Sequence, residues 1–584
     1  MHSAAEGVFG TPVVFGPAER RLCGWYHAPA RPTRSCAVLL CPPIGWEALA
    51  THRTYRVLAE QLCEDGFPVL RFDLDGSGDS AGTDEDPQRV AAWLGSIREA
   101  AGHLKVRSGR LELAFFGIHS GATLAAQAAS ELGGVETLVL WSPYLQGRQL
   151  VREIRAYRAL NDPDAPLVEG EEGAGGFLYL SETLEAFATL DLLQLTTPAR
   201  RALLLQRDAT SREATLATTW GATGVEVSCE SSDGFAAMML EPRKSTVPTQ
   251  TLARVAQWLS EVHPEMAVVK PLPVSVPPTP EALVEGPGYR EESGFFGAAH
   301  GLFGVLTRST QGQRRAQTIV FVNTASDHRV GPSRMYVTLS RNLAAAGFDC
   351  FRFDPTGLGD NRSPYSHLDV GAHSQVRQND LTAVLDVLDG GGIAKQFVLV
   401  GLCSGAYVAF HVGRADQRVV GEVLINPQTF VWHDGDSLDV KVRQSFKSSR
   451  YYKKALFERG VRKRLAAGDV NVLGIGRTLL SRIAGRVLKA VFRRLPLTKN
   501  DVAFVFQGFR AMLARGTDTL VIFGASDGGI DIFDGYVGAN GGALRSSPHF
   551  RIEILDTPDH TFSRTRDQRT LSALLITHLT QRFT

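Results

Sequence analysis

The segment 401–405, Gly-Leu-Cys-Ser-Gly, places a thiol between two glycines. The apolar run QFVLV precedes it and the helix-like run AYVAFHVG follows it. A strand-to-helix turn that exposes a nucleophile is strained and needs small residues two positions before and two after the nucleophile. This register favours Cys403 over Ser404, because Ser404 at the tip would be preceded by the bulky Leu402. We predict that Cys403 is a nucleophile; a buried structural cysteine is the alternative.

A thiol nucleophile needs a general base, and the base needs an acid that orients it. On such turns the acid and then the histidine follow the nucleophile along the chain. Asp527 follows the strand-like run DTLVIFG, and His560 follows the run FRIEIL. We therefore predict a triad of Cys403, His560 and Asp527, with Asp531 and Asp534 as alternative acids. Taken singly, His560 could be a surface-loop histidine and Asp527 a turn former.

An attack on a carbonyl carbon also needs backbone N–H donors that stabilise the negative charge on the carbonyl oxygen. One donor is expected from the residue after the nucleophile, Ser404. The second is expected from the loop VNTASD at 322–327, and we assign it to Thr324.

These candidate residues lie in the second copy of an internal repeat. RFDLDGSGDS at 71–80 returns as RFDPTGLGDN at 352–361, and GIHSGA at 117–122 returns as GLCSGA at 401–406. In both copies, short β-branched runs alternate with helical stretches. This alternation predicts an α/β fold with a mostly parallel sheet in each half.

A proline-rich segment separates the two copies. It contains PLPVSVPPTP at 271–280, which favours an extended spacer over a helix or a central strand. We predict a first domain at 1–262, a linker at 263–290 and a second domain at 291–584.

The first copy lacks the chemistry of the second. His119 stands where the second copy has its cysteine, and Gly234 stands opposite the predicted catalytic histidine. The oxyanion loop contains prolines at 42–43, which have no N–H to donate. Ser120 lies one residue too late to be the nucleophile, and Asp208 remains as an acid. We predict a degenerate, inactive copy; a histidine nucleophile at His119 is the alternative.

Both halves resemble α/β-hydrolase-fold domains over nearly the whole chain outside the linker. The cysteine turn is similar to that of dienelactone hydrolases. The second half more closely resembles the hydrolase-like proteins encoded beside bacterial exopolysaccharide and exosortase genes. That likeness is carried by GPSRMYVTLSRNLAAAGF, RFDPTGLGD, GLCSGA and NPQTFVWHDGDSL. The resemblance implies two tandem α/β-hydrolase domains, the second of them active.

A basic insertion interrupts the second half at about 430–515, where α/β hydrolases that have a cap domain usually carry it. Residues 441–515 contain 19 Lys or Arg against 3 Asp or Glu, a local charge of +16. The run LLSRIAGRVLKAVFRRL at 479–495 predicts a basic amphipathic helix. Its cationic face includes Arg482, Arg486, Lys489 and Arg493.

Three roles for this predicted cap stay open. Its cations could pair with acidic surface on the other half of the chain. They could attract an anionic substrate, such as a pantetheine or CoA thioester, an acidic carrier protein or an acidic glycan. They could also dock the protein on an anionic membrane leaflet.

The 584 residues carry 62 Lys or Arg and 61 Asp or Glu, and this balance favours no nucleic-acid partner. The seven cysteines include no CxxC pair, and no apolar run approaches about 20 residues. The N-terminus has neither the basic nor the apolar region of a signal peptide. We expect a soluble cytoplasmic protein without a cofactor and without a metal site.

The expected function is that of an acyl hydrolase of the thioesterase or esterase type. It would form a covalent acyl-enzyme on Cys403 from a small-molecule or carrier-bound acyl (thio)ester. An acyltransferase that passes the acyl group to an alcohol or amine is the first alternative, and opening of a dienelactone-type ring is a narrower one. A non-catalytic scaffold or membrane-surface protein is the alternative from another class.

Overall fold

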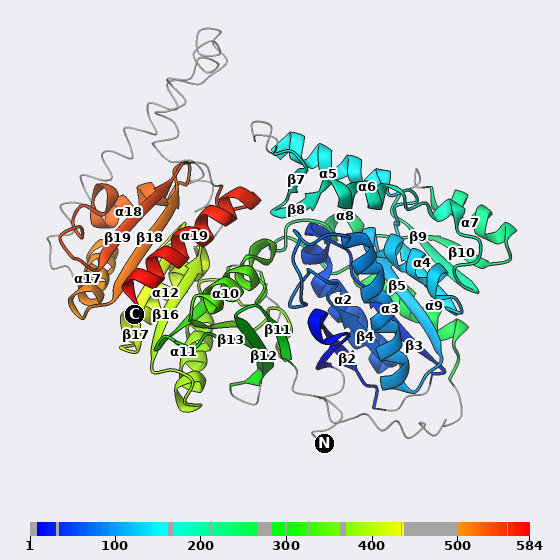
Figure 1. The fold of residues 1–584 in the computed structure, drawn as a ribbon, viewed down its shortest axis with the longest axis horizontal. Coiled ribbons are helices and arrows are strands. Elements are labelled where there is room, and N and C mark those ends of the chain that lie inside the picture. Colours follow the sequence, from blue (N-terminus) through cyan, green and yellow to red (C-terminus); the bar gives the residue numbers. More distant parts are fainter. Residues whose placement is uncertain are drawn as a thin grey trace, which may run out of the picture. The chain divides into compact units, whose positions relative to one another are not determined.

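The computed structural model describes residues 9–30, 34–161, 168–208, 212–265, 283–297, 301–324, 327–362, 370–433, 435–436, 500–556 and 559–583. The chain divides into two compact units. The first comprises Met1–Gly294 and Ser333–Val337, and the second comprises Phe295–Pro332 and Thr338–Thr584. Each unit contains one large sheet with helices packed against it (Figure 1).

The first unit contains an eight-stranded sheet in the order β1-β2-β4-β3-β5-β6-β9-β10. Its strands are β1 (Thr11–Phe15), β2 (Leu22–His27), β3 (Cys36–Cys41), β4 (Val69–Phe72), β5 (Glu112–Ile118), β6 (Thr137–Trp141), β9 (Arg201–Gln206) and β10 (Glu226–Ser231). Within this sheet, β4, β3, β5, β6, β9 and β10 are parallel to one another. The strands β2 and β1 extend the sheet in antiparallel pairs.

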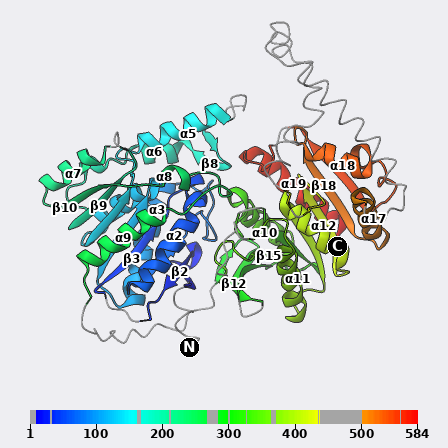
Figure 2. The ribbon, with the colours of Figure 1, turned by 180° about the vertical axis from the view of Figure 1, so that it is seen from behind.

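The helices of this unit cover both faces of the sheet. They are α2 (Trp46–Glu64), α3 (Arg89–Ser108), α4 (Ser120–Leu132), α5 (Arg148–Asn161), α6 (Ser181–Ala188), α7 (Glu213–Ala222), α8 (Phe235–Met238) and α9 (Thr249–Val262). A separate hairpin consists of β7 (Glu171–Ala174) and β8 (Phe177–Leu180). Alternate residues of β3 pack against α2 and α9 on one face and against α3 and α4 on the other, as expected for a parallel strand buried on both sides (Figure 2).

The other large sheet has nine strands, most of them from the second unit, in the order β11-β12-β13-β15-β14-β16-β17-β18-β19. Its strands are β11 (Leu283–Gly286), β12 (Tyr289–Phe296), β13 (Leu302–Ser309), β14 (Gln317–Val322), β15 (Asp349–Asp354), β16 (Gln396–Leu402), β17 (Val419–Ile425), β18 (Asp518–Gly524) and β19 (Phe550–Leu555). Its helices are α10 (Met335–Ala345), α11 (Gln375–Gly390), α12 (Ser404–Ala415), α17 (Asp501–Ala514), α18 (Gly529–Val537) and α19 (Thr565–Arg582).

Apart from β11, the strands of the second sheet follow the order of the first, so that β16 corresponds to β5 and β14 to β3. The predicted mostly parallel sheets flanked by helices are therefore confirmed. The structure differs from the sequence analysis at the end of the predicted linker 263–290. There β11 pairs with β12 as an antiparallel hairpin, which begins three residues after the last proline of the proline-rich run. Most of the predicted cap, 437–499, lies outside the described residues.

Candidate functional site

Cys403 lies on a strained turn between β16 and α12. Its backbone has φ 55° and ψ −114°, a conformation that a residue with a side chain rarely adopts. A Cβ atom added to Gly401 would lie 2.4 Å from the backbone of Gly405, and one added to Gly405 would lie 2.3 Å from the carbonyl oxygen of Val322. Two glycines at this spacing are thus required by the packing, in the register that the sequence indicates.

The structure brings together Cys403, Asp527 and His560, which are spread over more than 150 residues of the sequence. His560 Nδ1 donates to Asp527 Oδ2 at 2.6 Å, and His560 also shares a hydrogen bond with Cys403. Asp527 is buried, whereas the side chain of His560 is about one-third exposed (35%). Because Nδ1 faces the carboxylate, Nε2 is the nitrogen left for the thiol.

Asp527 follows β18, and two further groups hold its second oxygen. Oδ1 accepts from Gln428 Nε2 at 2.8 Å and from the N–H of Gly529 at 2.7 Å. The alternative acids do not take this place: among the described residues, Asp527 is the carboxylate for which a contact with His560 is recorded. Asp534 instead accepts from the N–H of Asn540 at 2.8 Å.

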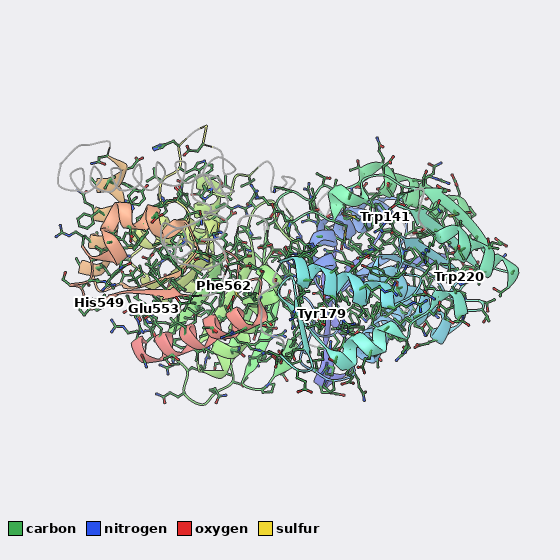
Figure 3. The ribbon with its side chains drawn as sticks, turned by 90° about the horizontal axis from the view of Figure 1, so that it is seen from above. Trp141, Tyr179, Trp220, His549, Glu553 and Phe562 are labelled. Carbon is green, nitrogen blue, oxygen red and sulfur yellow. The ribbon has the colours of Figure 1, made fainter. Side chains whose placement is uncertain are left out.

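Two residues that the sequence analysis did not identify hold the histidine loop in place. Asn426 donates to the carbonyl oxygen of His560 at 2.8 Å and accepts from the N–H of Gly524 at 2.9 Å. Phe562, labelled in Figure 3, is fully buried and anchors the same loop. Asn426 is the middle residue of the INP triplet that follows β17, and Gln428 comes directly after this triplet. The repetition of WSP as INP was the signal that could have revealed Asn426 and Gln428.

The pKa of His560 reflects this environment. Burial alone would lower the pKa, but the charges of Cys403 and Asp527, together with the hydrogen bonds that His560 makes with these two side chains, more than offset burial. The pKa of His560 is therefore raised well above its ordinary value. A raised imidazole pKa keeps His560 protonated beside the side chain of Cys403 at neutral pH.

This pKa predicts how the contribution of His560 to stability depends on pH. The folded state binds the proton more tightly than the unfolded state, in which the pKa of histidine is about 6.5. The stabilisation should be complete below about pH 6.5 and should disappear as the pH rises through the folded-state value. Unfolding of wild type and His560→Ala at pH 5–10 measures it. A difference in unfolding free energy that stays constant or grows with pH would contradict the assignment.

The residues of the two expected oxyanion donors, Ser404 and Thr324, line one pocket. Ser404 is the first residue of α12, and within the described residues its N–H has no recorded backbone acceptor. Thr324 follows β14, and its hydroxyl donates to the carboxylate of Asp327 at 2.5 Å. Gly405 lies directly against the carbonyl oxygens that end β14, which brings the loop and the helix start together.

The first unit repeats the turn with a different side chain. His119 lies between β5 and α4 with φ 54° and ψ −117°, nearly the conformation of Cys403. Its ring is buried between Tyr144, at a centroid distance of 4.1 Å, and Phe235, at 5.3 Å. Phe235 follows Gly234, so an apolar ring approaches the tip of this turn from the segment that carries the histidine in the second unit.

A carboxylate fills the oxyanion position of the first unit. Glu47 Oε2 accepts from the N–H of Ser120 at 3.1 Å and from its hydroxyl, and Oε1 lies 2.7 Å from His119 Nδ1. Burial alone would raise the pKa of Glu47, but the charge of His119 and the hydrogen bonds from His119 and Ser120 lower it overall. Asp208 does not join this cluster: its side chain is 46% exposed and pairs with Arg207.

We predict that Glu47→Ala lowers the unfolding free energy of the first unit by about 3 kcal/mol at pH 7, because it leaves buried donors without an acceptor. Since the pKa of Glu47 is lowered on folding, the loss should shrink as the pH falls below about 4. Tryptophan fluorescence reports this unit, because six of the seven tryptophans precede residue 263. Glu131→Ala, at an exposed ion pair, is the control. Equal effects of the two substitutions would contradict the prediction.

The predicted basic face of the cap, formed by Arg482, Arg486, Lys489 and Arg493, lies outside the described residues. Within the described part of the chain, no helix is long and apolar enough to cross a membrane. The same residues contain no group of three or more His, Cys, Asp or Glu side chains that could hold a metal ion.

Comparisons with known proteins identify the fold of both halves. Residues 319–563 match the model of an alpha/beta hydrolase family, and residues 49–163 match the model of the serine aminopeptidase S33 family. No curated protein sequence matches the chain.

Similar solved structures include three hydrolases. Ferulic-acid-bound Est1E from Butyrivibrio proteoclasticus is 18% identical over 42% of this chain and 96% of its own, with a TM-score of 0.33. The esterase Pf2001 of Pyrococcus furiosus is 14% identical over 51% and 92%, with a TM-score of 0.30. XC6422 from Xanthomonas campestris, described as an α/β serine hydrolase without a lid, is 13% identical over 44% and 97%, with a TM-score of 0.30.

Proposed function

Both halves of the chain have the α/β-hydrolase fold, and from this premise we propose that the second unit is an acyl hydrolase of the thioesterase or esterase type. Cys403 is its nucleophile, His560 its general base and then acid, and Asp527 the residue that orients the imidazole. The observation that carries the proposal is the continuous contact from Cys403 through His560 to Asp527 at a strained turn.

In the first step, Cys403 Sγ attacks the carbonyl carbon of the (thio)ester, and His560 Nε2 holds the proton from the thiol. The carbonyl oxygen becomes negatively charged and accepts hydrogen bonds from the N–H groups of Ser404 and Thr324. The bond to the leaving thiol or alcohol then breaks, and His560 donates the proton to that group. The product is an acyl thioester on Cys403.

In the second step, His560 takes a proton from water, and the resulting hydroxide attacks the acyl thioester. The bond between the acyl carbon and Cys403 Sγ breaks, and the thiol regains its proton. An alcohol or amine that takes the place of water would receive the acyl group instead, which is the acyltransferase alternative. Dienelactone-type ring opening would follow the same steps with the leaving alcohol kept in the product.

The dependence of product formation on an added acceptor separates hydrolysis from transfer. The full chain is mixed with an acyl-pantetheine donor, and free acid and free thiol are quantified with and without alcohol and amine acceptors. A hydrolase releases the acid at the same rate in both cases. Release only after an acceptor is added, with an acyl conjugate as the product, would contradict hydrolysis and identify a transferase.

We propose further that the first unit is not catalytic. Its oxyanion position is filled by Glu47, which also holds His119 Nδ1, and the ring of His119 is covered by Tyr144 and Phe235. The remaining proposals come from the sequence: a cytoplasmic enzyme of a bacterial exopolysaccharide or exosortase gene cluster, with a basic cap that meets an acidic carrier protein or an anionic membrane surface. A non-catalytic scaffold would keep its cellular function in Cys403→Ala and lose it on charge reversal at Arg486, Lys489 and Arg493.

A further inference from the structure

A pocket of the second unit adjoins the proposed oxyanion hole. Its opening and interior together comprise about 280 Å³ of space not filled by atoms, open solvent included, and the enclosed part has room for about one water molecule. Thr324 and Ser404, whose N–H groups are the proposed oxyanion donors, contribute to its wall. Most of the remaining wall is apolar and includes Phe353, Leu358 and Val408. An acyl group bound at Cys403 would therefore meet a mainly apolar space beside its carbonyl.

One cation faces this pocket. Arg377, the third residue of α11, lines it and is only 6% exposed. Among the described residues, neither Nη1 nor Nη2 of its guanidinium group has a hydrogen-bond partner. The neighbouring Asp380 uses its two carboxylate oxygens on the N–H and the hydroxyl of Thr356, at 2.8 and 3.0 Å. Burial lowers the pKa of Arg377 to about 10, which leaves the group cationic at neutral pH.

Two other polar groups of the same pocket also lack partners. The hydroxyl of Ser404 is buried without a hydrogen bond, and so is the side-chain carbonyl oxygen of Asn323. Buried polar groups are nearly always hydrogen-bonded, and a buried unpaired cation is especially unfavourable. Groups from α11, α12 and the end of β14 therefore converge on one space without satisfying one another. The guanidinium group of Arg377 and the hydroxyl of Ser404 are donors and indicate a ligand that accepts hydrogen bonds and carries negative charge, whereas Asn323 Oδ1 is an acceptor and needs a separate donor.

The first unit shows that the fold itself does not require this arginine. There the N–H of Asp75 donates to Ser96 at 3.1 Å, just as the N–H of Thr356 donates to Asp380 in the second unit. Ser96 is therefore the counterpart of Asp380. Three residues before Ser96 stands Trp93, so Trp93 is the counterpart of Arg377.

The indole of Trp93 donates to the carbonyl oxygen of Asp75 at 3.2 Å. The counterpart of Ser404, Ser120, bonds Glu47 and accepts from the N–H of Ile44 at 3.1 Å. The inactive unit thus satisfies its polar groups in this region, whereas the proposed active unit leaves them open.

We propose that the substrates of the second unit are acyl (thio)esters whose acyl chain ends in a carboxylate, which Arg377 binds. This inference rests on the acyl-enzyme function proposed above and names its substrate class. The planar guanidinium group can donate two parallel N–H bonds to a carboxylate, and the hydroxyl of Ser404 supplies a third donor. The methylene groups between the carboxylate and the reacting carbonyl pack against the apolar wall.

The test compares two matched donors, succinyl-pantetheine and its neutral methyl ester, on the full chain. The rate of Cys403 acylation is followed by intact mass. A buried charge-assisted pair predicts that wild type prefers the charged donor by about 10- to 100-fold. In Arg377→Met the ratio of the two rates should fall to near one. Lys395→Met, which removes an exposed positive charge beyond the other end of α11, should retain the wild-type ratio.

The stability of Arg377→Met gives a second readout. Removing a buried cation whose Nη atoms make no hydrogen bond among the described residues, and whose burial only the charge of Asp380 offsets, should leave the melting temperature unchanged or raise it. A lowered melting temperature with an unchanged donor ratio would mean that Arg377 is structural and would overturn the proposal. So would a wild type that does not prefer the charged donor.

If neither donor acylates the protein, the proposed acyl-enzyme function is contradicted. Calorimetric titration with succinate and monomethyl succinate then tests separately whether the pocket binds a carboxylate. Preferential binding of succinate that is lost in Arg377→Met would support the carboxylate site. Absence of binding would overturn it.

Discussion

Replacing His560 with alanine is expected to slow the acylation of Cys403 by about 10³-fold or more. General-base catalysis by a positioned side chain contributes about 10²- to 10⁴-fold, and triad members act as a unit. Here the histidine is the one described residue that contacts both the thiol and the acid. Removing it also removes the group that takes up the proton of the thiol during the attack. Single-turnover acylation with an acyl-pantetheine donor measures the effect.

The matched control is His549→Ala. His549 directly precedes β19 in the same unit and is labelled in Figure 3, and it has no recorded contact with Cys403 or Asp527. Its replacement should leave the acylation rate within about 3-fold of wild type, as for a surface substitution away from the site. Equal rates for His560→Ala and wild type would show that another group activates the thiol.

Replacing Gly405 with alanine is expected to be the most destabilising single substitution of the site, by about 4 kcal/mol or more. The added Cβ atom would lie 2.3 Å from the carbonyl oxygen of Val322 and 2.9 Å from that of Asn323. Both atoms belong to backbone at the end of β14, so neither can rotate away. Relief of the clash requires α12 to move away from the sheet, which also displaces the thiol and the N–H of Ser404.

Hydrogen exchange of the β14 and β16 amides measures this effect in the full chain. Gly390→Ala is the control, because a Cβ atom at Gly390, the last residue of α11, meets no atom within 4 Å. It should be neutral or slightly stabilising. Native-like protection in Gly405→Ala would contradict the close packing of the turn.

The sequence was sufficient to predict the turn at Cys403 and the contact of His560 with Asp527, because both depend on local rules. The two glycines fix the register around Cys403, and the order of nucleophile, acid and histidine follows from parallel strands whose carboxyl ends meet at one edge. The repeat supplied the correspondence of His119 with Cys403, and the two residues have nearly the same backbone angles.

Other parts of the site depend on contacts that no periodicity reveals. Glu47 contacts His119 although more than 70 residues separate them in the sequence, and it fills the oxyanion position of the first unit. The sequence indicated only that the loop at this position contains prolines. Arg377 reads as an ordinary charged residue of a helix, and its burial becomes visible only when α11 is placed against the end of β14. The hairpin of β11 and β12 was missed because the nearby prolines dominate the composition of that segment.

The central claim is that Cys403 carries an acyl group during turnover, and intact mass spectrometry tests it directly. Wild type and Cys403→Ala are incubated briefly with acyl-pantetheine thioesters and activated esters, alongside Cys229→Ala as a control for the exposed thiol. The account predicts one acyl adduct in wild type and Cys229→Ala and none in Cys403→Ala. An adduct that persists in Cys403→Ala would contradict it, as would a wild type that no donor acylates although Cys403 still reacts with iodoacetamide.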